Sequence, residues 1–460
     1  MTNSLTCFKA YDVRGELGVN FDAEICYRIG RAFARTIRAK TVVVGRDARA
    51  TSPELADSLC EGMIAEGVTV LDIGMAGTEE MYWATSFFEA DGGIEITASH
   101  NPINYNGLKM VKSGSRPLDP ETDLLAVKAC AEAAEFGSVI PGGQRQDRVA
   151  EAKAAYVEKV ISFVDVTNLR PLRIVVNSGN GAAGPTFDAL AQALGEKTDA
   201  FEFIRLFHAP DSTFPNGIPN PLLPENHAPT RDAVLAHGAD LGIAFDGDFD
   251  RCFFFDESGR FIAGEYIVGL LASVMLEKNP GASIVHDPRV VWNTKDLVRS
   301  KGGTAVQAKT GHAFVKQVMR KSDAVYGGEM SAHHYFRDFA YCDSGMIPWL
   351  LIAELVSRSE RSLGSWVKDR FAAFPSSGEM NFKVTDAEKS IENVLSAYRA
   401  AARSIDETDG VSLAFDVWRF NLRRSNTEAL VRLNVESKGK AETLAAHVSA
   451  ISDLLGGTRA

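Results

Sequence analysis

Several features that mark particular protein classes are scarce or missing in this sequence. The longest apolar runs, 266–276 and 346–353, are shorter than the roughly 20 residues that a helix needs to cross a bilayer, so we expect core helices there. The first residues lack the apolar segment of a signal peptide. The six cysteines are scattered without a Cys-x-x-Cys pair, which indicates neither zinc nor a disulfide framework. These absences predict a cytoplasmic protein with reduced thiols and no membrane partner.

A basic surface for nucleic acid is also not expected, because the formal net charge is −11. A local basic pocket remains compatible with that total. The chain has 460 residues, of which 45% are hydrophobic and 24% charged, and this composition is typical of globular proteins that bury several cores. Its length suggests three or four domains.

A repeated pattern organises most of the chain: a short apolar β-rich run, a polar loop, and then a stretch with helical periodicity. It occurs at 41–67, 172–195 and 283–303, and in altered form at 93–111, where the loop leads into another strand. Strands that alternate with helices predict α/β units with parallel or mixed sheets. In such sheets ligands bind at loops beyond the carboxyl ends of the strands.

Turn-rich stretches near residues 146, 260 and 374 suggest the domain boundaries. After the last of them, β-rich runs and two helical stretches, 387–405 and 439–455, predict a small α+β domain of a different type. We therefore expect four domains, which we place at 1–145, 146–259, 260–372 and 373–460.

The strongest chemical signal is the row of alternating aspartates Asp246, Asp248 and Asp250 between two apolar runs. Carboxylates this close repel one another unless a hard cation neutralises them. Three protein ligands leave coordination positions open for waters or a phosphate, which favours Mg²⁺. An EF-hand is the competing motif, with Glu257 at loop position 12, but Arg251 occupies the position that needs glycine. A solvated acidic turn is the other alternative, and the apolar flanks argue against it.

Two further clusters suggest sugar and phosphate binding. In 326–336, Glu329 and His333 lie among glycines and aromatic residues and suit sugar hydroxyls, although a polar turn would look the same. The stretch 420–433 has a composition that suits a phosphate. Its candidate ligands are Arg423, Ser425, Asn426, Thr427 and Arg432. The alternative there is a simple helix N-cap.

The glycines at 179–184 match G-x-G-x-x-G after a strand, which is the pattern of a dinucleotide-binding turn. The acidic partner should end the next strand, yet Glu202 lies inside it and His208 follows it. We therefore expect these glycines to form a tight strand-to-helix turn.

Ser99 lies in a run, 97–102, that alone would suggest only a turn. Together, however, the motifs TASHNP (97–102), DGDFDR (246–251), GEMSAH (328–333) and RRSNTE (423–428) resemble those of the α-D-phosphohexomutases. The resemblance spans essentially the whole chain. Met330 favours the bacterial phosphomannomutase/phosphoglucomutase group, since phosphoglucosamine mutases tend to have glutamine there.

The resemblance implies a heart-shaped fold of three related α/β domains and a C-terminal TATA-box-binding-like α+β domain. It also implies that Ser99 is a phosphoserine and that the three aspartates bind Mg²⁺ together with a phosphoryl oxygen on Ser99. Glu329, Ser331 and His333 would hold the sugar. The phosphate ligands would be those of 420–433, and the residues implied around the reaction centre are Tyr11, Arg14, His100, Lys109, Arg251 and His312. Arg289 stands where relatives have a lysine, which keeps the charge but replaces a point charge with a planar fork.

The implied activity is the interconversion of D-mannose 6-phosphate and D-mannose 1-phosphate, with action on glucose phosphates as well. Phospho-Ser99 would donate its phosphoryl group, and a hexose 1,6-bisphosphate would be both intermediate and activator. The product would feed GDP-mannose and surface polysaccharide synthesis, and the enzyme would be a monomer or homodimer. A metal-dependent phosphatase and a non-catalytic Mg²⁺ and sugar-phosphate binding module are the alternative functions.

Overall fold

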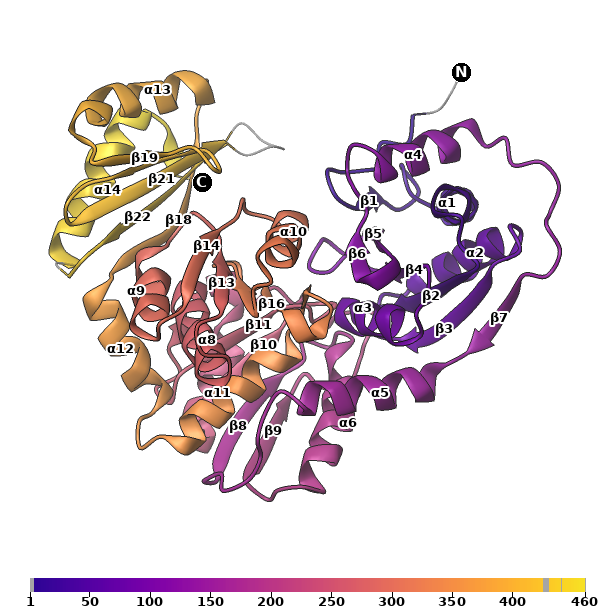
Figure 1. Cartoon of the computed structure of the whole chain (residues 1–460), viewed down its shortest axis with the longest axis horizontal. Helices are drawn as coiled ribbons and strands as arrows, with labels where there is room; N and C mark the ends of the chain where they lie inside the picture. The colour runs from indigo at the N-terminus through magenta and orange to yellow at the C-terminus, as the bar shows by residue number, and fades with distance from the viewer. Residues whose placement is uncertain (1–3, 425–429, 440, 460) are drawn as a thin grey trace. The chain divides into compact units, whose positions relative to one another are not determined.

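A computed structural model describes residues 4–424, 430–439 and 441–459. The chain forms two compact units, the first from residues 1–261 and 338–360 and the second from residues 262–337 and 361–460. Each unit is described by itself below, with the element labels of Figure 1. None of the helices in this described part combines the length and the hydropathy that crossing a bilayer requires.

The first sheet of the first unit has the order β1-β5-β4-β2-β3-β7, with β6 paired to β5. Its strands are β1 (Val13–Glu16), β2 (Thr41–Arg46), β3 (Thr69–Met75), β4 (Gly92–Ile96), β5 (Tyr105–Lys112), β6 (Arg116–Pro117) and β7 (Gln144–Asp147). The accompanying helices are α1 (Ala23–Ile37), α2 (Ser52–Ile64), α3 (Thr78–Phe87) and α4 (Asp123–Ala133), with a 3₁₀ turn at Ser113–Ser115. Because β2 and β4 are parallel neighbours, the loops that follow them leave the same edge of the sheet.

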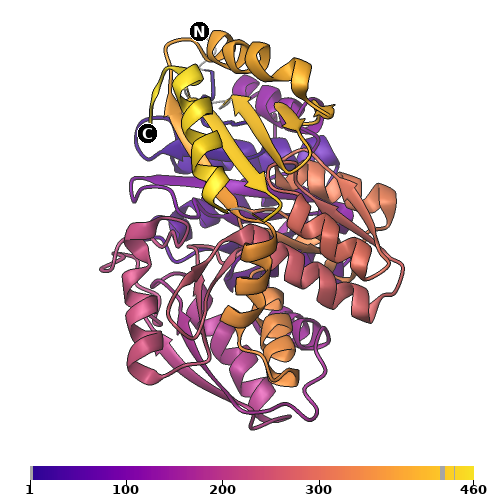
Figure 2. The same ribbon diagram turned by 90° about the vertical axis from the view of Figure 1, so that its left-hand side faces the viewer.

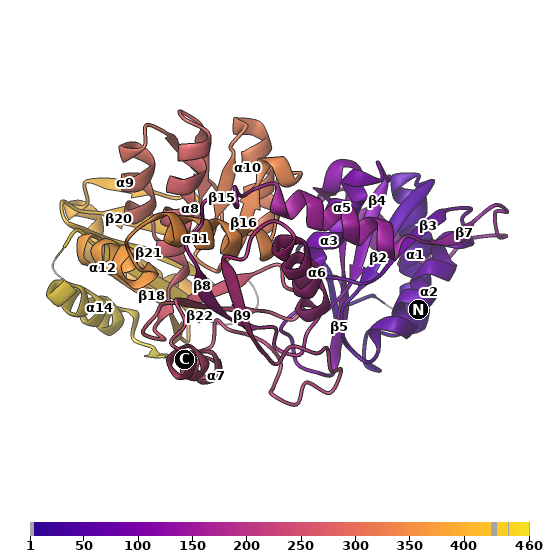
Figure 3. The ribbon, with the colours of Figure 1, turned by 90° about the horizontal axis from the view of Figure 1, so that it is seen from below.

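The second sheet of this unit has the order β12-β11-β10-β8-β9. Its strands are β8 (Leu172–Asn177), β9 (Phe201–Leu206), β10 (Leu241–Phe245), β11 (Cys252–Phe255) and β12 (Phe261–Ile262). Its helices are α5 (Val149–Ile161), α6 (Ala183–Gly195) and α7 (Ala228–His237), with a 3₁₀ turn at Pro224–Asn226. Figure 3 shows α5 alongside α6.

Because strands β8 and β10 are parallel neighbours, the loops that follow them lie side by side. The glycine-rich stretch after β8 is a tight turn into α6, with Gly179 at φ 59° and Asn180 at φ 57°. The Ala182 N–H donates to the Gly247 carbonyl at 3.3 Å, which ties this turn to the acidic loop after β10. The expectation of a tight strand-to-helix turn is confirmed.

The chain returns to the first unit with β17 (Cys342–Asp343) and the buried helix α11 (Met346–Arg358), which packs against α5 and β11. The Met346 N–H and the Tyr156 hydroxyl both donate to the buried Glu79 carboxylate, at 3.2 and 2.8 Å. Residues 338–360 therefore belong to the first compact unit, although they lie within the stretch 260–372 that the sequence suggests as a third domain.

The second unit begins with a sheet in which β13 lies between β14 and β15 and pairs parallel with both. The strands of this sheet that belong to the second unit are β13 (Ser283–His286), β14 (Thr304–Gln307), β15 (Tyr326–Gly328) and the antiparallel β16 (His334–Phe336). Its helices are α8 (Gly264–Lys278), α9 (Trp292–Ser300), α10 (His312–Ser322) and α12 (Leu363–Ala373), and a 3₁₀ turn spans Arg337–Phe339. The core helices expected at 266–276 and 346–353 are confirmed as α8 and α11.

The second unit ends in an antiparallel sheet of order β19-β20-β21-β22-β18-β23. Its strands are β18 (Ser376–Lys383), β19 (Ser404–Asp406), β20 (Val411–Ala414), β21 (Trp418–Arg424), β22 (Leu430–Ser437) and β23 (Thr458–Arg459). Helices α13 (Ala387–Tyr398) and α14 (Ala441–Leu455) pack on it, and Figure 2 shows the yellow α14 against the strands.

This last sheet corrects one expectation. The helix predicted over 387–405 ends at Tyr398, a 3₁₀ turn follows at Arg399–Ala401, and Ser404–Asp406 is the strand β19. Ser404–Asp406 pairs antiparallel with the next strand, β20, and this strand pairing outweighs the helical pattern of the sequence. The broader prediction of strand–helix alternation followed by a C-terminal α+β part is confirmed.

Candidate active site

Ser99 lies in the loop between β4 and β5 in a strained conformation. Its φ of 47° is in the left-handed region that L-residues other than Gly, Asn and Asp rarely adopt, and the residue is only 4% exposed. The Ser99 N–H donates to Thr97 Oγ1 at 2.8 Å, and the Ser99 hydroxyl donates to Asp246 Oδ2 at 2.8 Å. The loop therefore holds the hydroxyl against the acidic segment of another sheet.

The three aspartates after β10 form one buried cluster. Carboxylate oxygens of Asp246, Asp248 and Asp250 lie within 4.8 Å of one another. Burial raises the pKa of Asp250 well above its usual range, and the Asp248 charge adds to this rise. Burial also acts to raise the pKa of Asp248, but the Lys109 ammonium outweighs it and lowers that pKa. The cluster therefore concentrates negative charge that needs a cation.

Lys109, from β5, supplies part of that positive charge. Its Nζ donates to Asp248 Oδ2 at 2.7 Å and also to the Asp250 carboxylate. Burial by itself lowers the Lys109 pKa, and the two carboxylates more than reverse this effect. At the start of α3, the Thr78 hydroxyl donates to Asp248 Oδ2 at 2.6 Å.

The cluster fits a divalent cation by its donor chemistry. Asp248 Oδ1 is buried and has no hydrogen-bond partner among the described residues. Oxygen donors from carboxylates and a hydroxyl are those that Mg²⁺ and Ca²⁺ prefer. Gly247 is needed for this packing, since a Cβ there would lie 2.4 Å from the Ser99 carbonyl oxygen.

Arg251 and His100 also lie beside Ser99 and Asp246. Arg251 donates to Asp246 Oδ2 through Nε at 3.0 Å and Nη2 at 2.8 Å, and Nη2 also contacts His100 Nδ1. His100 Nδ1 lies 3.1 Å from Ser99 Oγ. Partial burial and the charges of Arg251 and Arg14 lower the His100 pKa, which favours the neutral ring.

Arg14, from β1, donates to the Ala98 carbonyl at 3.1 Å and to the Asn101 side chain, and Tyr11 lies just before that strand. The first unit thus gathers most of the residues that the sequence suggests around the reaction centre. They are Ser99, His100, Arg14, Lys109, Asp246, Asp248, Asp250 and Arg251.

The second unit brings together the predicted sugar-binding residues. The Glu329 carboxylate accepts from the Gly311 N–H at 2.7 Å and from the Tyr335 hydroxyl at 2.6 Å. His333 Nδ1 lies 3.8 Å from the Glu329 carboxylate and 3.3 Å from Ser331 Oγ. His312 opens α10 directly after Gly311.

Arg289 lies beside this group and uses the planar fork that a lysine lacks. Its Nε and Nη2 both donate to Asp287 Oδ2, at 3.0 and 2.6 Å, and its Nη2 lies 3.8 Å from the Glu329 carboxylate. Asp287 Oδ2 also accepts the Met330 N–H at 3.0 Å. The arginine therefore connects the loop after β13 to the segment that carries Glu329.

Arg423 and Arg432 stand directly opposite each other across β21 and β22. Like charges in that position repel, and Glu379 on β18 lies between them, 2.7 Å from Arg423 and 3.5 Å from Arg432. Arg289 Nη1 is a further 3.5 Å neighbour of Glu379. Asp409 lies 3.8 Å from Arg423 as well. Three guanidinium groups thus converge at one place, and their forked N–H donors suit a phosphate.

Ser425, Asn426 and Thr427 lie outside the described residues. The structure also contains residues that the sequence analysis did not single out, among them Glu379, Asp287 and Thr78. Each has a partner far away in the sequence, Arg423 for Glu379, Met330 for Asp287 and Asp248 for Thr78, so local patterns carry little signal for these contacts.

Glu95 is another such residue. It lies in β4 directly opposite Lys109 of β5, is fully buried, and neither carboxyl oxygen has a hydrogen-bond partner among the described residues. Gly45 on β2 leaves space for it, since a Cβ there would lie 2.2 Å from Glu95 Oε2. Burial, with the charges of Asp47 and Asp248, raises the Glu95 pKa well above its usual range.

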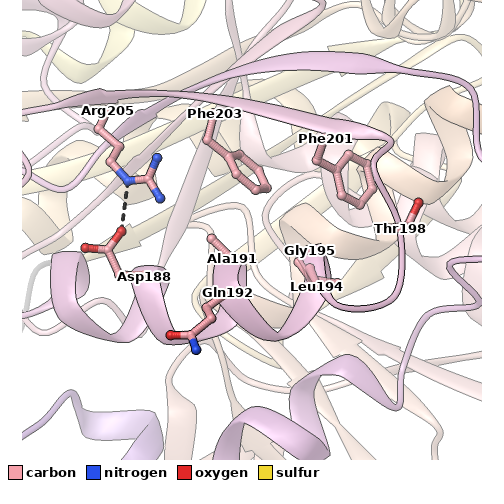
Figure 4. A pocket seen from close by; sticks show the side chains of 9 residues that line it. All are labelled: Asp188, Ala191, Gln192, Leu194, Gly195, Thr198, Phe201, Phe203 and Arg205. Atoms are coloured by element: carbon pink, nitrogen blue, oxygen red, sulfur yellow. Dashed lines mark hydrogen bonds and ion pairs between the residues drawn. The ribbon is translucent and has the colours of Figure 1, made fainter.

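A separate hollow of about 320 Å³ lies between α6 and β9, lined in part by Phe201, Phe203 and the Arg205–Asp188 ion pair (Figure 4). None of the predicted site residues lines it. The chemistry therefore points to the Ser99 and aspartate cluster and not to this hollow.

Comparisons with known proteins show which family the chain resembles. The four domain models of phosphoglucomutase/phosphomannomutase match the chain. Domains I, II and III, each described as alpha/beta/alpha, match residues 6–137, 154–259 and 263–374, and the C-terminal domain matches 379–454.

Similar full-length proteins are known. A phosphomannomutase of Salmonella montevideo is 55% identical over 453 residues, which cover 98% of this chain and 99% of the relative. A phosphomannomutase of Escherichia coli K12 is 55% identical over 451 residues, again 98% and 99% of the two chains. The crystal structure of a phosphoglucomutase/phosphomannomutase family protein from Burkholderia thailandensis is 33% identical, with a TM-score of 0.87 over 99% of each chain.

The buried Glu95 predicts a specific pH dependence of stability. A carboxyl group whose pKa is raised in the folded state stabilises the fold below its unfolded pKa, and that contribution is lost as pH rises. Glu95→Gln has the size of the protonated glutamic acid but does not ionise, so the loss of stability at higher pH should disappear. The free energy of unfolding of Glu95→Gln minus that of wild type, measured in chelator between pH 5 and 8, should therefore increase with pH, by up to about 1.4 kcal/mol per pH unit. A difference that does not vary with pH would show that Glu95 is ionised in the fold.

Proposed function

Because this chain belongs to the phosphoglucomutase/phosphomannomutase family, we propose that it is a mutase that interconverts D-mannose 6-phosphate and D-mannose 1-phosphate. The observation that carries the proposal is the Ser99 hydroxyl, strained and buried, 2.8 Å from a cluster of three aspartates. A serine in this setting can carry a phosphoryl group whose charge the surrounding groups stabilise.

In the proposed reaction, the bond between phosphorus and Ser99 Oγ breaks while a bond forms between phosphorus and the free sugar hydroxyl. The sugar hydroxyl loses its proton, and Ser99 Oγ leaves as an alkoxide that takes up a proton. The neutral His100 ring, 3.1 Å from Ser99 Oγ, can move that proton. Arg14, Arg251 and Lys109 provide positive charge near the phosphoryl group. The resulting hexose 1,6-bisphosphate turns end for end and returns its other phosphoryl group to Ser99.

The metal we propose is Mg²⁺, held by Asp246, Asp248 and Asp250 together with an oxygen on Ser99. When bound, the ion would neutralise charge on the transferring phosphoryl group. Lys109 already bridges two of the carboxylates, so it keeps the cluster compact and partly neutralised before substrate binds.

The second unit supplies the groups that recognise the substrate in this proposal. Glu329, Ser331 and His333 would hold sugar hydroxyls. Arg289, Arg423 and Arg432, with Ser425, Asn426 and Thr427, would bind the phosphate that is not being transferred. Tyr11, from the first unit, and His312 would line the reaction centre.

Selectivity between mannose and glucose phosphates should be modest. The two sugars differ only at the 2-hydroxyl, and one hydroxyl contact discriminates strongly only where a buried polar group is left unpaired. Glu329 already has two hydrogen-bond donors from the protein, so it tolerates the loss of one sugar contact.

The proposal also covers the domain boundaries, the location and the oligomeric state of the enzyme. The boundaries 1–145, 146–259, 260–372 and 373–460 would mark four domains. The enzyme would act in the cytoplasm as a monomer or homodimer, with hexose 1,6-bisphosphate as activator. Its product would feed GDP-mannose and surface polysaccharide synthesis.

A coupled assay tests the proposed activity. Wild type with Mg²⁺ and catalytic glucose 1,6-bisphosphate should convert mannose and glucose 1-phosphates, and glucosamine 1-phosphate poorly. Ser99→Ala should lose at least about a thousandfold in kcat, because the phosphoryl carrier is gone. Free phosphate is measured in the same samples. Phosphate release that matches substrate loss would favour a phosphatase, and sugar-phosphate binding without turnover would favour a binding module.

The arginine pair generates a second prediction. Arg423→Ala should raise KM for mannose 1-phosphate about 10- to 150-fold, the equivalent of one lost charge-assisted bond of about 1.5–3 kcal/mol. Its neighbour Arg424 is the matched control, because it is exposed and pairs only with the exposed Glu388 among the described residues. Arg424→Ala should change KM less than about threefold. Equal effects of the two substitutions on KM would contradict the assignment of Arg423.

A further inference from the structure

Arg49 lies in the loop between β2 and α2 and is only 3% exposed. Its guanidinium group donates to four backbone carbonyls, three in the loop that carries Ser99 (residues 97–104) and one at Tyr105, the first residue of β5. Nη2 donates to Ser99 at 3.0 Å and to Asn101 at 2.6 Å, and Nη1 donates to Pro102 at 2.9 Å and to Tyr105 at 3.0 Å. One side chain therefore binds the backbone of residues 99–105 at four points.

The arginine is itself fixed in place. Asp47 Oδ1 accepts the Arg49 N–H at 2.9 Å and the Ser52 hydroxyl at 2.6 Å, and Asp47 Oδ2 lies 3.6 Å from Arg49 Nε. The ring of Phe214, whose centroid is 5.9 Å away, covers the guanidinium from the second sheet's side. Because Arg49 and Asp47 are both buried, this guanidinium has little freedom to rotate away from the loop.

The Ser99 loop needs such a support. Residues 97–104 lie between two strands and form no strand pairs of their own, and Ser99 holds a left-handed φ that costs free energy unless its surroundings impose it. A planar guanidinium offers five N–H donors in a rigid fork, so it can bind several carbonyls at once, whereas a lysine offers one point charge.

We infer that Arg49 is a positioning residue for phosphoryl transfer, which holds the Ser99–Tyr105 backbone so that Ser99 Oγ stays against the aspartate cluster. This inference rests on the proposed mutase function. The Arg49 guanidinium contacts the Ser99 loop only through backbone carbonyls. The residues proposed to bind the substrate's sugar and distal phosphate lie in the second unit. Its loss should therefore lower kcat and leave KM nearly unchanged.

Arg28 in α1 is a matched control. Its Nε donates to the Ala131 carbonyl at 2.8 Å and its Nη2 to the Glu132 carbonyl at 3.1 Å, at the end of α4. It is thus another guanidinium that binds backbone carbonyls in the same α/β domain, but none of its hydrogen-bond partners among the described residues belongs to the Ser99 loop. Arg28→Lys makes the same chemical change without touching that loop.

The experiment compares Arg49→Lys, Arg28→Lys and wild type in the coupled assay and by thermal unfolding. Arg49→Lys should lower kcat about 100-fold, the scale expected for a displaced reacting group, with KM within about threefold. Arg28→Lys should lower the melting temperature and keep kcat within about threefold. In Arg49→Ala, millimolar guanidinium should restore part of kcat, and sodium chloride at the same ionic strength should not.

A structural readout separates this inference from the proposed activity. In Arg49→Lys, backbone amides of residues 97–106 should exchange hydrogen at least about tenfold faster than in wild type, whereas in Arg28→Lys they should not. If wild type lacks mutase activity, the proposed function fails, and the exchange result still decides whether Arg49 holds the loop. Unchanged exchange and kcat in Arg49→Lys, or equal kcat losses in the two lysine variants, would overturn the inference.

Discussion

The structure of the first unit depends on one electrostatic constraint, the burial of three aspartates beside a serine hydroxyl. Such a cluster is unfavourable unless cations and donors surround it. Lys109, Arg251 and Thr78 meet this requirement from three different elements. Gly247, which lacks a side chain, allows the Ser99 backbone to come into contact with the acidic loop. Two loops from different sheets are thereby held together by charge.

The same principle operates with opposite sign in the second unit. There, Arg289, Arg423 and Arg432 converge on Glu379, and further carboxylates hold two of these arginines in place. Their forked N–H donors would suit a dianionic phosphate. One unit thus concentrates carboxylates that suit a metal ion, and the other concentrates guanidinium groups that suit a phosphate. Phosphoryl transfer on a sugar phosphate requires both kinds of group.

Much of this organisation could be predicted from the sequence because its signals are local. The alternation of Asp246, Asp248 and Asp250 between apolar runs indicates a metal loop, and strand–helix alternation indicates the α/β sheets. The roles of Arg49, Glu95 and Glu379 could not be predicted, since each depends on partners in other elements. Arg49, for example, contacts a loop about 50 residues away in sequence. Likewise, the residues after Tyr398 have a helical pattern, but pairing with β20 makes Ser404–Asp406 a strand.

The central claim is that Ser99 carries a phosphoryl group and passes it directly to the sugar. The most direct measurement is a single turnover with enzyme labelled at Ser99 by radioactive phosphate and mixed with unlabelled mannose 6-phosphate. The label should leave the protein at the rate of turnover and appear first in hexose bisphosphate, and then in mannose 1-phosphate. Label that appears directly as inorganic phosphate, or that stays on the protein through many turnovers, would contradict the account.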